Sequence, residues 1–123
     1  MQKDLRFGWW SDMVNQALLD QELAAAEVAW KDGNDGKARV CARRAVGLVT
    51  EAWLSGLPEP LWRGDAMEHL RRIHQLEAFP VPVRQAAERL STAVPRRDAA
   101  PFTTDPLADA RVIIEYLAAD TRE

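Results

Sequence analysis

The most regular apolar pattern in the chain lies between Asp35 and Leu54. At about 100° per residue, one face of a helix through this segment collects residues that are small at its start and large at its end, namely Ala38, Cys41, Ala42, Ala45, Leu48, Val49, Ala52 and Trp53. The opposite face collects most of the charges, namely Lys37, Arg39, Arg43, Arg44 and Glu51. The pattern predicts a helix whose small residues let a neighbouring helix approach closely and whose mostly basic side faces water.

Four other segments have a helical period, and turn residues separate them. We expect helices from residue 11 or 12 to 32, from 35 to 56, from 61 to 78, from 81 to 94 and from 106 onward. Gly33 supplies a left-handed stop and Asp35 is the expected N-cap of the next helix, so the first two helices form an antiparallel hairpin. Asp105 followed by Pro106 is typical of a helix start. The predicted fold is an all-α antiparallel bundle of about five helices, without a sheet.

The first predicted helix carries two apolar stripes. One contains Met13, Val14, Ala17, Leu18, Ala24, Ala25 and Val28, and the other contains Leu19, Leu23, Ala26 and Trp30. A helix with one wet side needs a single stripe, so either this helix is central, or its second stripe meets another chain or the Trp9-Trp10 segment. We expect a homodimer and leave open a further protein partner. The expected dimer surface consists of Leu19, Leu23, Trp30 and either Trp9 or Trp10.

Composition and charge are those of one globular domain spanning residues 1–123. Hydrophobic residues make up 47% of the chain and charged residues 28%, which excludes global disorder, and only residues 95–104 have the composition of a mobile linker. The net charge of −3 gives no general attraction to nucleic acid. No apolar run is long enough for a membrane span, and residues 1–6 lack the apolar core of a secretory signal. Because the single cysteine, Cys41, cannot form an internal disulfide, we expect a cytoplasmic protein.

Familiar catalytic and cofactor signatures are absent from the sequence. The chain has no phosphate-binding loop, no glycine fingerprint and no nucleophile elbow. Its two histidines, His69 and His74, and its one cysteine are too few soft ligands for a structural metal. We therefore expect neither a cofactor nor a metal.

The hairpin from Ala17 to Leu54 resembles the first two long helices of HEPN domains. The likeness rests on a pattern of small residues, tryptophans and a turn, namely Ala24-Ala25-Ala26, Trp30, Gly33-Asn34-Asp35-Gly36, Ala38, Ala42, Ala45 and Trp53-Leu54. HEPN domains are compact helical bundles, often dimeric. Many are metal-independent ribonucleases, and others are partners of nucleotidyltransferase-like proteins. The resemblance therefore implies either an RNA-cleaving enzyme or an assembly module.

Active HEPN domains have an arginine followed a few residues later by a histidine, and Arg63 and His69 have that spacing. By resemblance, Arg63 would hold the scissile phosphate and His69 would assist transfer of the 2′-hydroxyl proton. The segment has Gly64 where active members tend to have a polar residue, and it lies earlier in the bundle than is usual. Asp65 and His69 are also four residues apart on the predicted helix and can simply pair.

Two further groups of residues allow a functional or a structural interpretation. The basic residues of the segment 37–44 can contact phosphates, but the negative net charge favours a solvated face balanced by acids such as Glu51. The tryptophans are more often core anchors than the lining of a ligand site. These five residues are Trp9, Trp10, Trp30, Trp53 and Trp62.

The sequence therefore favours a non-catalytic HEPN-like binding or assembly module. The alternative is a metal-independent, toxin-like endoribonuclease that binds RNA and uses Arg63 and His69. A third class is a bundle that binds a small ligand in a tryptophan-lined pocket, which nothing in the sequence requires.

Overall fold

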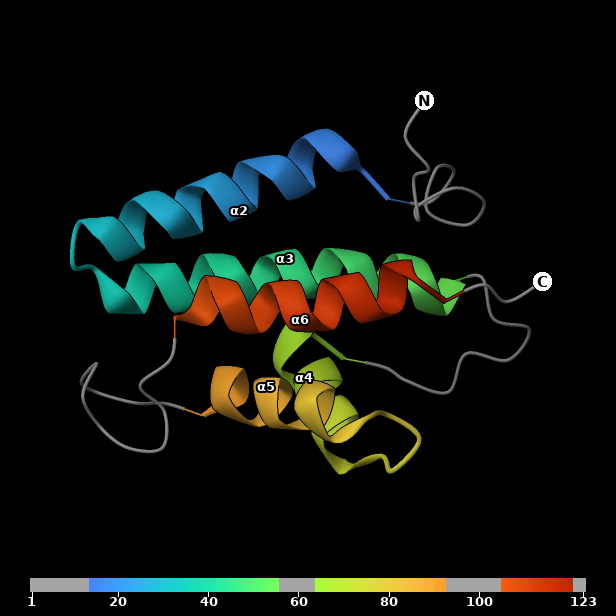
Figure 1. Cartoon of the computed structure of the whole chain (residues 1–123). Coiled ribbons are helices and arrows are strands. Elements are labelled where there is room, and N and C mark those ends of the chain that lie inside the picture. Colours follow the sequence, from blue (N-terminus) through green and yellow to red (C-terminus); the bar gives the residue numbers. More distant parts are fainter. Residues whose placement is uncertain (1–13, 56–63, 93–104, 121–123) are drawn as a thin grey trace.

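The computed structural model describes residues 14–55, 64–92 and 105–120. In these residues the chain forms five helices and no strand (Figure 1). The helices are α2 (Gln16–Lys31), α3 (Asp35–Ser55), α4 (Ala66–Gln75), α5 (Val81–Ser91) and α6 (Pro106–Ala118). The predicted all-α bundle is confirmed. The expected linker at residues 95–104 lies outside the described residues, as do Trp9, Trp10 and Trp62.

The α2–α3 hairpin begins and turns slightly differently from the prediction. Asn15 caps α2 by accepting a hydrogen bond from the backbone N–H of Leu18 at 3.0 Å, so this helix begins later than residue 12. Gly33 has a φ of 80° and ends the hairpin's first helix as predicted. The expected cap at Asp35 is wrong, because Asn34 Oδ1 accepts from the backbone N–H of Lys37 at 3.2 Å and Asp35 is already helical.

Helix α6 begins as its sequence predicts, whereas α4 is shorter than expected. Asp105 accepts a hydrogen bond from the backbone N–H of Leu107 at 2.8 Å, with Pro106 in the first helical position. Helix α4 ends at Gln75 instead of residue 78, and the connection to α5 runs through Phe79, which is buried. This short connection brings an aromatic ring to the same end of the bundle as the last turn of α3.

Helix α3 is the centre of the bundle, and it contacts each of the other four helices (Figure 1). Helix α2 packs mainly on α3, so the option that the first helix is central is wrong. One of its stripes faces inward, with Leu19 only 1% exposed, while Val28 on the other stripe is 59% exposed. At Gly47 of α3 the backbones approach closely, since a Cβ there would lie 3.0 Å from that of Ala66 in α4.

The helices do not all alternate in direction. Helix α2 runs antiparallel to α3, but α6 lies beside α3 and parallel to it (Figure 1). A hydrogen bond joins the last turn of α3 to Asp120, two residues beyond the end of α6, from Trp53 Nε1 to Asp120 Oδ2 at 2.6 Å. The carboxyl ends of α3 and α6 therefore meet at the same end of the bundle.

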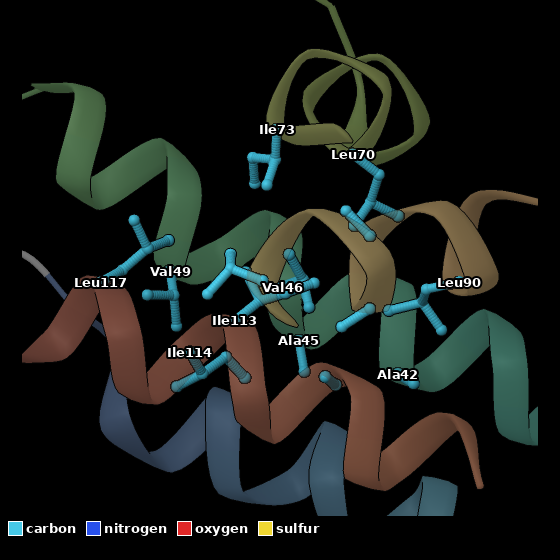
Figure 2. Close-up of a cluster of buried hydrophobic side chains, with 14 of the residues drawn as sticks. Ala42, Ala45, Val46, Val49, Leu70, Ile73, Leu90, Ile113, Ile114 and Leu117 are labelled. Carbon is cyan, nitrogen blue, oxygen red and sulfur yellow. The ribbon is translucent and has the colours of Figure 1, made fainter. Parts of the chain in front are cut away.

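One apolar cluster joins α3 to α4, α5 and α6 (Figure 2). Ala42 and Ala45 of α3 are fully buried in it, so the small face of α3 accommodates these helices as well as α2. The inward residues predicted for the last helix are all buried, namely Leu107, Ala110, Ile113, Ile114 and Leu117. In the described part of the chain, none of the helices combines the length and apolar character that a bilayer span requires.

Candidate functional site

His69, the candidate catalytic histidine, lies on α4 and is only 2% exposed. Its Nε2 is 3.1 Å from Oε2 of Glu51 on α3, a side chain that is itself 62% exposed. The suggested pairing with Asp65 is not formed, because Asp65 caps α4 and accepts from the backbone N–H of Glu68 at 3.1 Å. Arg63 lies outside the described residues. The His69 ring is buried in the packing between α3 and α4.

Gly64 has a conformational reason for being glycine. Its φ is 115°, in a region that other residues rarely adopt, and it precedes the N-cap of α4. A Cβ at this position would also lie 2.7 Å from Cγ of Glu68. The residue that departs from the HEPN motif is therefore required by the way the chain enters α4, and a polar side chain there would be strained.

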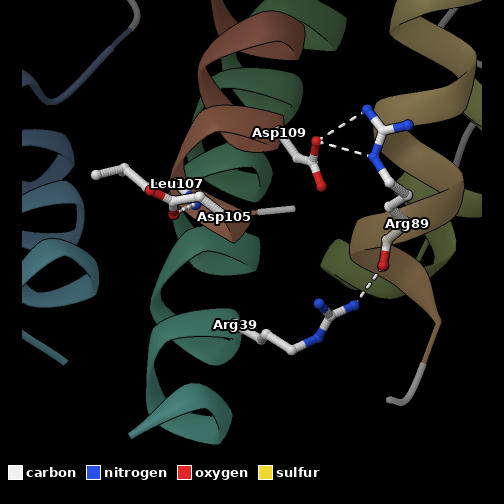
Figure 3. Close-up of polar contacts among 5 residues, drawn as sticks. All are labelled: Arg39, Arg89, Asp105, Leu107 and Asp109. Carbon is white, nitrogen blue, oxygen red and sulfur yellow. Dashed lines mark hydrogen bonds and ion pairs between the residues drawn. The ribbon is translucent and has the colours of Figure 1, made fainter. Parts of the chain in front are cut away.

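The basic face of α3 is not the solvated face that the sequence predicts, because two of its arginines bind the carboxyl end of α5. Arg39 is 7% exposed and donates a hydrogen bond to the backbone carbonyl of Arg89 (Figure 3). It donates a second one to the backbone carbonyl of Thr92 at 2.6 Å. Arg43 Nε donates to the carbonyl of Leu90 at 2.7 Å. The last carbonyls of a helix have no partner within it and carry negative polarity, which a guanidinium neutralises.

Burial makes the charged form of these two arginines less favourable. It lowers the pKa of Arg39, against the opposing attraction of Asp109 and Asp35. It also lowers the pKa of Arg43, and the positive charge of nearby Arg39 lowers it further. The hydrogen bonds of both guanidiniums stabilise the packing of α3 against α5. Of the four basic residues between positions 37 and 44, only Lys37 and Arg44 are exposed. The basic surface that the sequence offered for contacts with phosphates is therefore reduced mainly to these two side chains.

A buried ion pair stands next to Arg39 and joins α5 to α6 (Figure 3). Arg89 donates from Nε and Nη2 to Oδ1 of Asp109, at 3.1 and 3.0 Å. Asp109 is 3% exposed and lies in the first turn of α6. The polar side chains at this end of the bundle thus hold helices together.

The expected dimer surface on α2 is smaller than predicted. Leu19 is buried in the core of its own chain and cannot contribute to it, since the inward stripe of α2 packs on α3. Leu23 and Trp30 remain partly exposed. The more exposed apolar residue on α2 is Val28, from the stripe that was expected to face the core.

A pocket of about 440 Å³ lies at the opposite end from the arginines, where α3 and α6 finish. Its walls combine the last turn of α3, the end of α6 and the connection between α4 and α5. The lining residues are Trp53, Leu76, Ala78, Phe79, Tyr116, Ala119 and Asp120. The lining is therefore mainly apolar, with three aromatic rings and one carboxylate.

The three rings of this aromatic pocket are inclined to one another. The ring centroid of Phe79 is 6.2 Å from that of Trp53, with planes at 55°, and 5.7 Å from that of Tyr116, with planes at 64°. Phe79 is 6% exposed, while Tyr116 is 38% exposed. Such tilted contacts are favourable between aromatic rings.

Among the described residues that line the pocket, Asp120 is the one with a charged side chain. Its Oδ2 accepts the indole N–H of Trp53 at 2.6 Å, which fixes both the carboxylate and the indole. Sequence reasoning placed Trp53 on the core face and did not select Phe79, Tyr116 or Asp120. These residues come from segments far apart in the chain, and only the general possibility of a tryptophan-lined pocket pointed toward them.

Within the described residues, no three histidine, cysteine, aspartate or glutamate side chains are grouped to hold a metal ion.

Comparisons with known proteins identify no relative: no family model matches the chain, and neither curated proteins nor solved structures include a significant match.

Proposed function

We propose that this chain is a non-catalytic, HEPN-like helical binding module and that the aromatic pocket is its binding site. The observation that carries the proposal is the pocket itself, with apolar walls and a carboxylate fixed by Trp53. Ligand sites in proteins commonly have this form, a concave apolar surface with few and well-placed polar groups. The burial of His69 and its contact with Glu51 support a structural role for this histidine.

The relation to HEPN domains is part of the proposal. It is supported by the long antiparallel hairpin, in which α2 has 16 residues and α3 has 21. We place the protein in the cytoplasm, a location supported by Cys41, which is a buried free thiol. We also propose self-association through the outer side of α2, supported by the 59% exposure of Val28.

Binding in the pocket is tested by following the indole N–H signal of Trp53 in NMR spectra, assigned as the signal lost in Trp53→Phe. The probe is 3,3-dimethylbutan-1-ol, a small neutral molecule, and we expect it to shift this signal in a saturable way. Ala119→Phe adds a ring at the pocket wall and should abolish the shift. Ala108→Phe, at an exposed position of α6 outside the pocket, is the matched control and should leave the shift intact.

A Trp53 signal that responds neither to this alcohol nor to its charged isostere choline would overturn the binding site. The absence of catalysis is tested separately by incubating the purified chain with total and structured RNA in EDTA, where a metal-independent nuclease would remain active. We expect intact RNA. Cleavage that disappears in a folded His69→Ala variant would replace the proposal by the ribonuclease alternative.

A further inference from the structure

We infer that the aromatic pocket binds an organic cation, a quaternary or alkylated ammonium group. The inference rests on the proposed function, because it names the ligand class of the same pocket. Three features of the described residues lead to it: the aromatic walls, the fixed carboxylate, and two helix ends of negative polarity without basic residues in their last turns.

The aromatic walls are suited to a cation with apolar substituents. The faces of aromatic rings carry negative potential and attract cations, and tryptophan is the most effective ring. Trp53, Phe79 and Tyr116 are inclined at 55° and 64°, so a rounded group in the pocket meets rings in several orientations. Methyl groups on an ammonium spread its charge over an apolar surface, which makes it complementary to such walls.

The carboxylate of Asp120 adds a formal charge of the required sign. Its hydrogen bond with the Trp53 indole holds it at the wall. A carboxylate oxygen accepts more than one interaction, so this bond leaves Asp120 able to face a cation. Asp120 also follows the carboxyl end of α6, where the helix dipole is already negative and a second negative charge is unfavourable.

The parallel arrangement of α3 and α6 brings a second helix end of the same polarity to the pocket (Figure 1). Neither helix has a basic residue in its last turn. The carboxyl end of α5 shows the contrast, because the fold places Arg39 and Arg43 on its carbonyls. At the pocket end, within the described residues, the corresponding cation is left for a ligand to supply.

The same features argue against other ligand classes. A neutral apolar molecule would fill the pocket but leave the negative potential uncompensated. Calcium or magnesium ions need several oxygen ligands, and the described lining residues offer a single carboxylate among mainly apolar side chains. An alkylated ammonium group can pack its alkyl substituents against the aromatic walls and pair its positive charge with the carboxylate of Asp120. The group can belong to a free small molecule or to a methylated lysine side chain.

The test compares two probes of the same shape, choline and 3,3-dimethylbutan-1-ol, by titration against the Trp53 indole signal of the full chain. We expect choline to bind about five- to thirtyfold more tightly, the ratio that cation–π contacts of about 1–2 kcal/mol produce. Added salt should reduce this preference, because the carboxylate is near the surface. Equal affinity for the two probes would overturn the inference while leaving the binding site in place, whereas no response to either would overturn both.

Two variants separate the charge from the shape of the pocket. Asp120→Asn keeps an acceptor for the Trp53 indole but removes the charge, and it should reduce the choline preference severalfold. Glu115→Gln removes an exposed charge of α6 outside the pocket and should not. A tripeptide with a central trimethyl-lysine distinguishes the source: tighter binding than choline assigns the ammonium to a protein side chain, and weaker binding to a free molecule. An unchanged choline preference in Asp120→Asn would contradict the inference.

Discussion

Replacing Asp109 by alanine should destabilise the protein by about 2–4 kcal/mol, because it leaves the guanidinium of Arg89 without its partner. The carboxylate is 3% exposed, and its Oδ1 accepts two hydrogen bonds from Arg89. Breaking a buried ion pair by removing one partner typically costs about 3–5 kcal/mol. The Arg89 side chain is 26% exposed, so it can recover part of its hydration, which lowers the expected loss to about 2–4 kcal/mol.

The measurement is urea unfolding followed by circular dichroism, with an unchanged slope as evidence that the same surface unfolds. Glu27→Ala is the control, because Glu27 pairs with Lys31 at 3.2 Å on the surface and should change the stability by less than about 1 kcal/mol. The double variant Arg89→Met/Asp109→Leu should recover much of the loss, since it leaves no unpaired charge. The reasoning is refuted if Asp109→Ala is no more destabilising than Glu27→Ala.

Three further predictions address the core, the entry to α4 and the assembly. Ala45→Leu should lose about 1–3 kcal/mol by overpacking a fully buried site, and unchanged thermal stability would contradict the core described above. Gly64→Ala should lose about 1–3 kcal/mol because its φ is 115°, whereas Gly36→Ala, with open space around its Cβ, should not. Light scattering should show a homodimer, and a monomer at micromolar concentration would end that proposal.

Local signals in the sequence were sufficient for most of the secondary structure. The helical period of residues 107–117 predicts the buried face of α6, and Gly33 predicts the end of α2. The exact caps were less predictable, because neighbouring residues such as Asn34 and Asp35 can each accept the same backbone hydrogen bonds. The sequence of the first helix shows two apolar stripes, and which of them faces inward depends on how α2 packs on α3.

The candidate site depended far more on contacts between distant segments. His69 and Asp65 have a spacing that allows pairing on one helix, yet the capping role of Asp65 and the proximity of Glu51 on α3 give His69 another partner. Arg39 has a long side chain that can reach water or a protein carbonyl. Its partner was settled only when the end of α5 came to lie beside α3.

The sequence by itself determined that this protein is an all-α bundle, because the burial of one helical face follows from the apolar period along that helix. Only the tertiary structure decided that α6 runs parallel to α3, and with it the meeting of Trp53 with Asp120, which lie 67 residues apart. The apolar period is the same for either direction of a helix. The direction depends on the packing free energy of all the helices together, and this sets which polar and aromatic side chains share a surface.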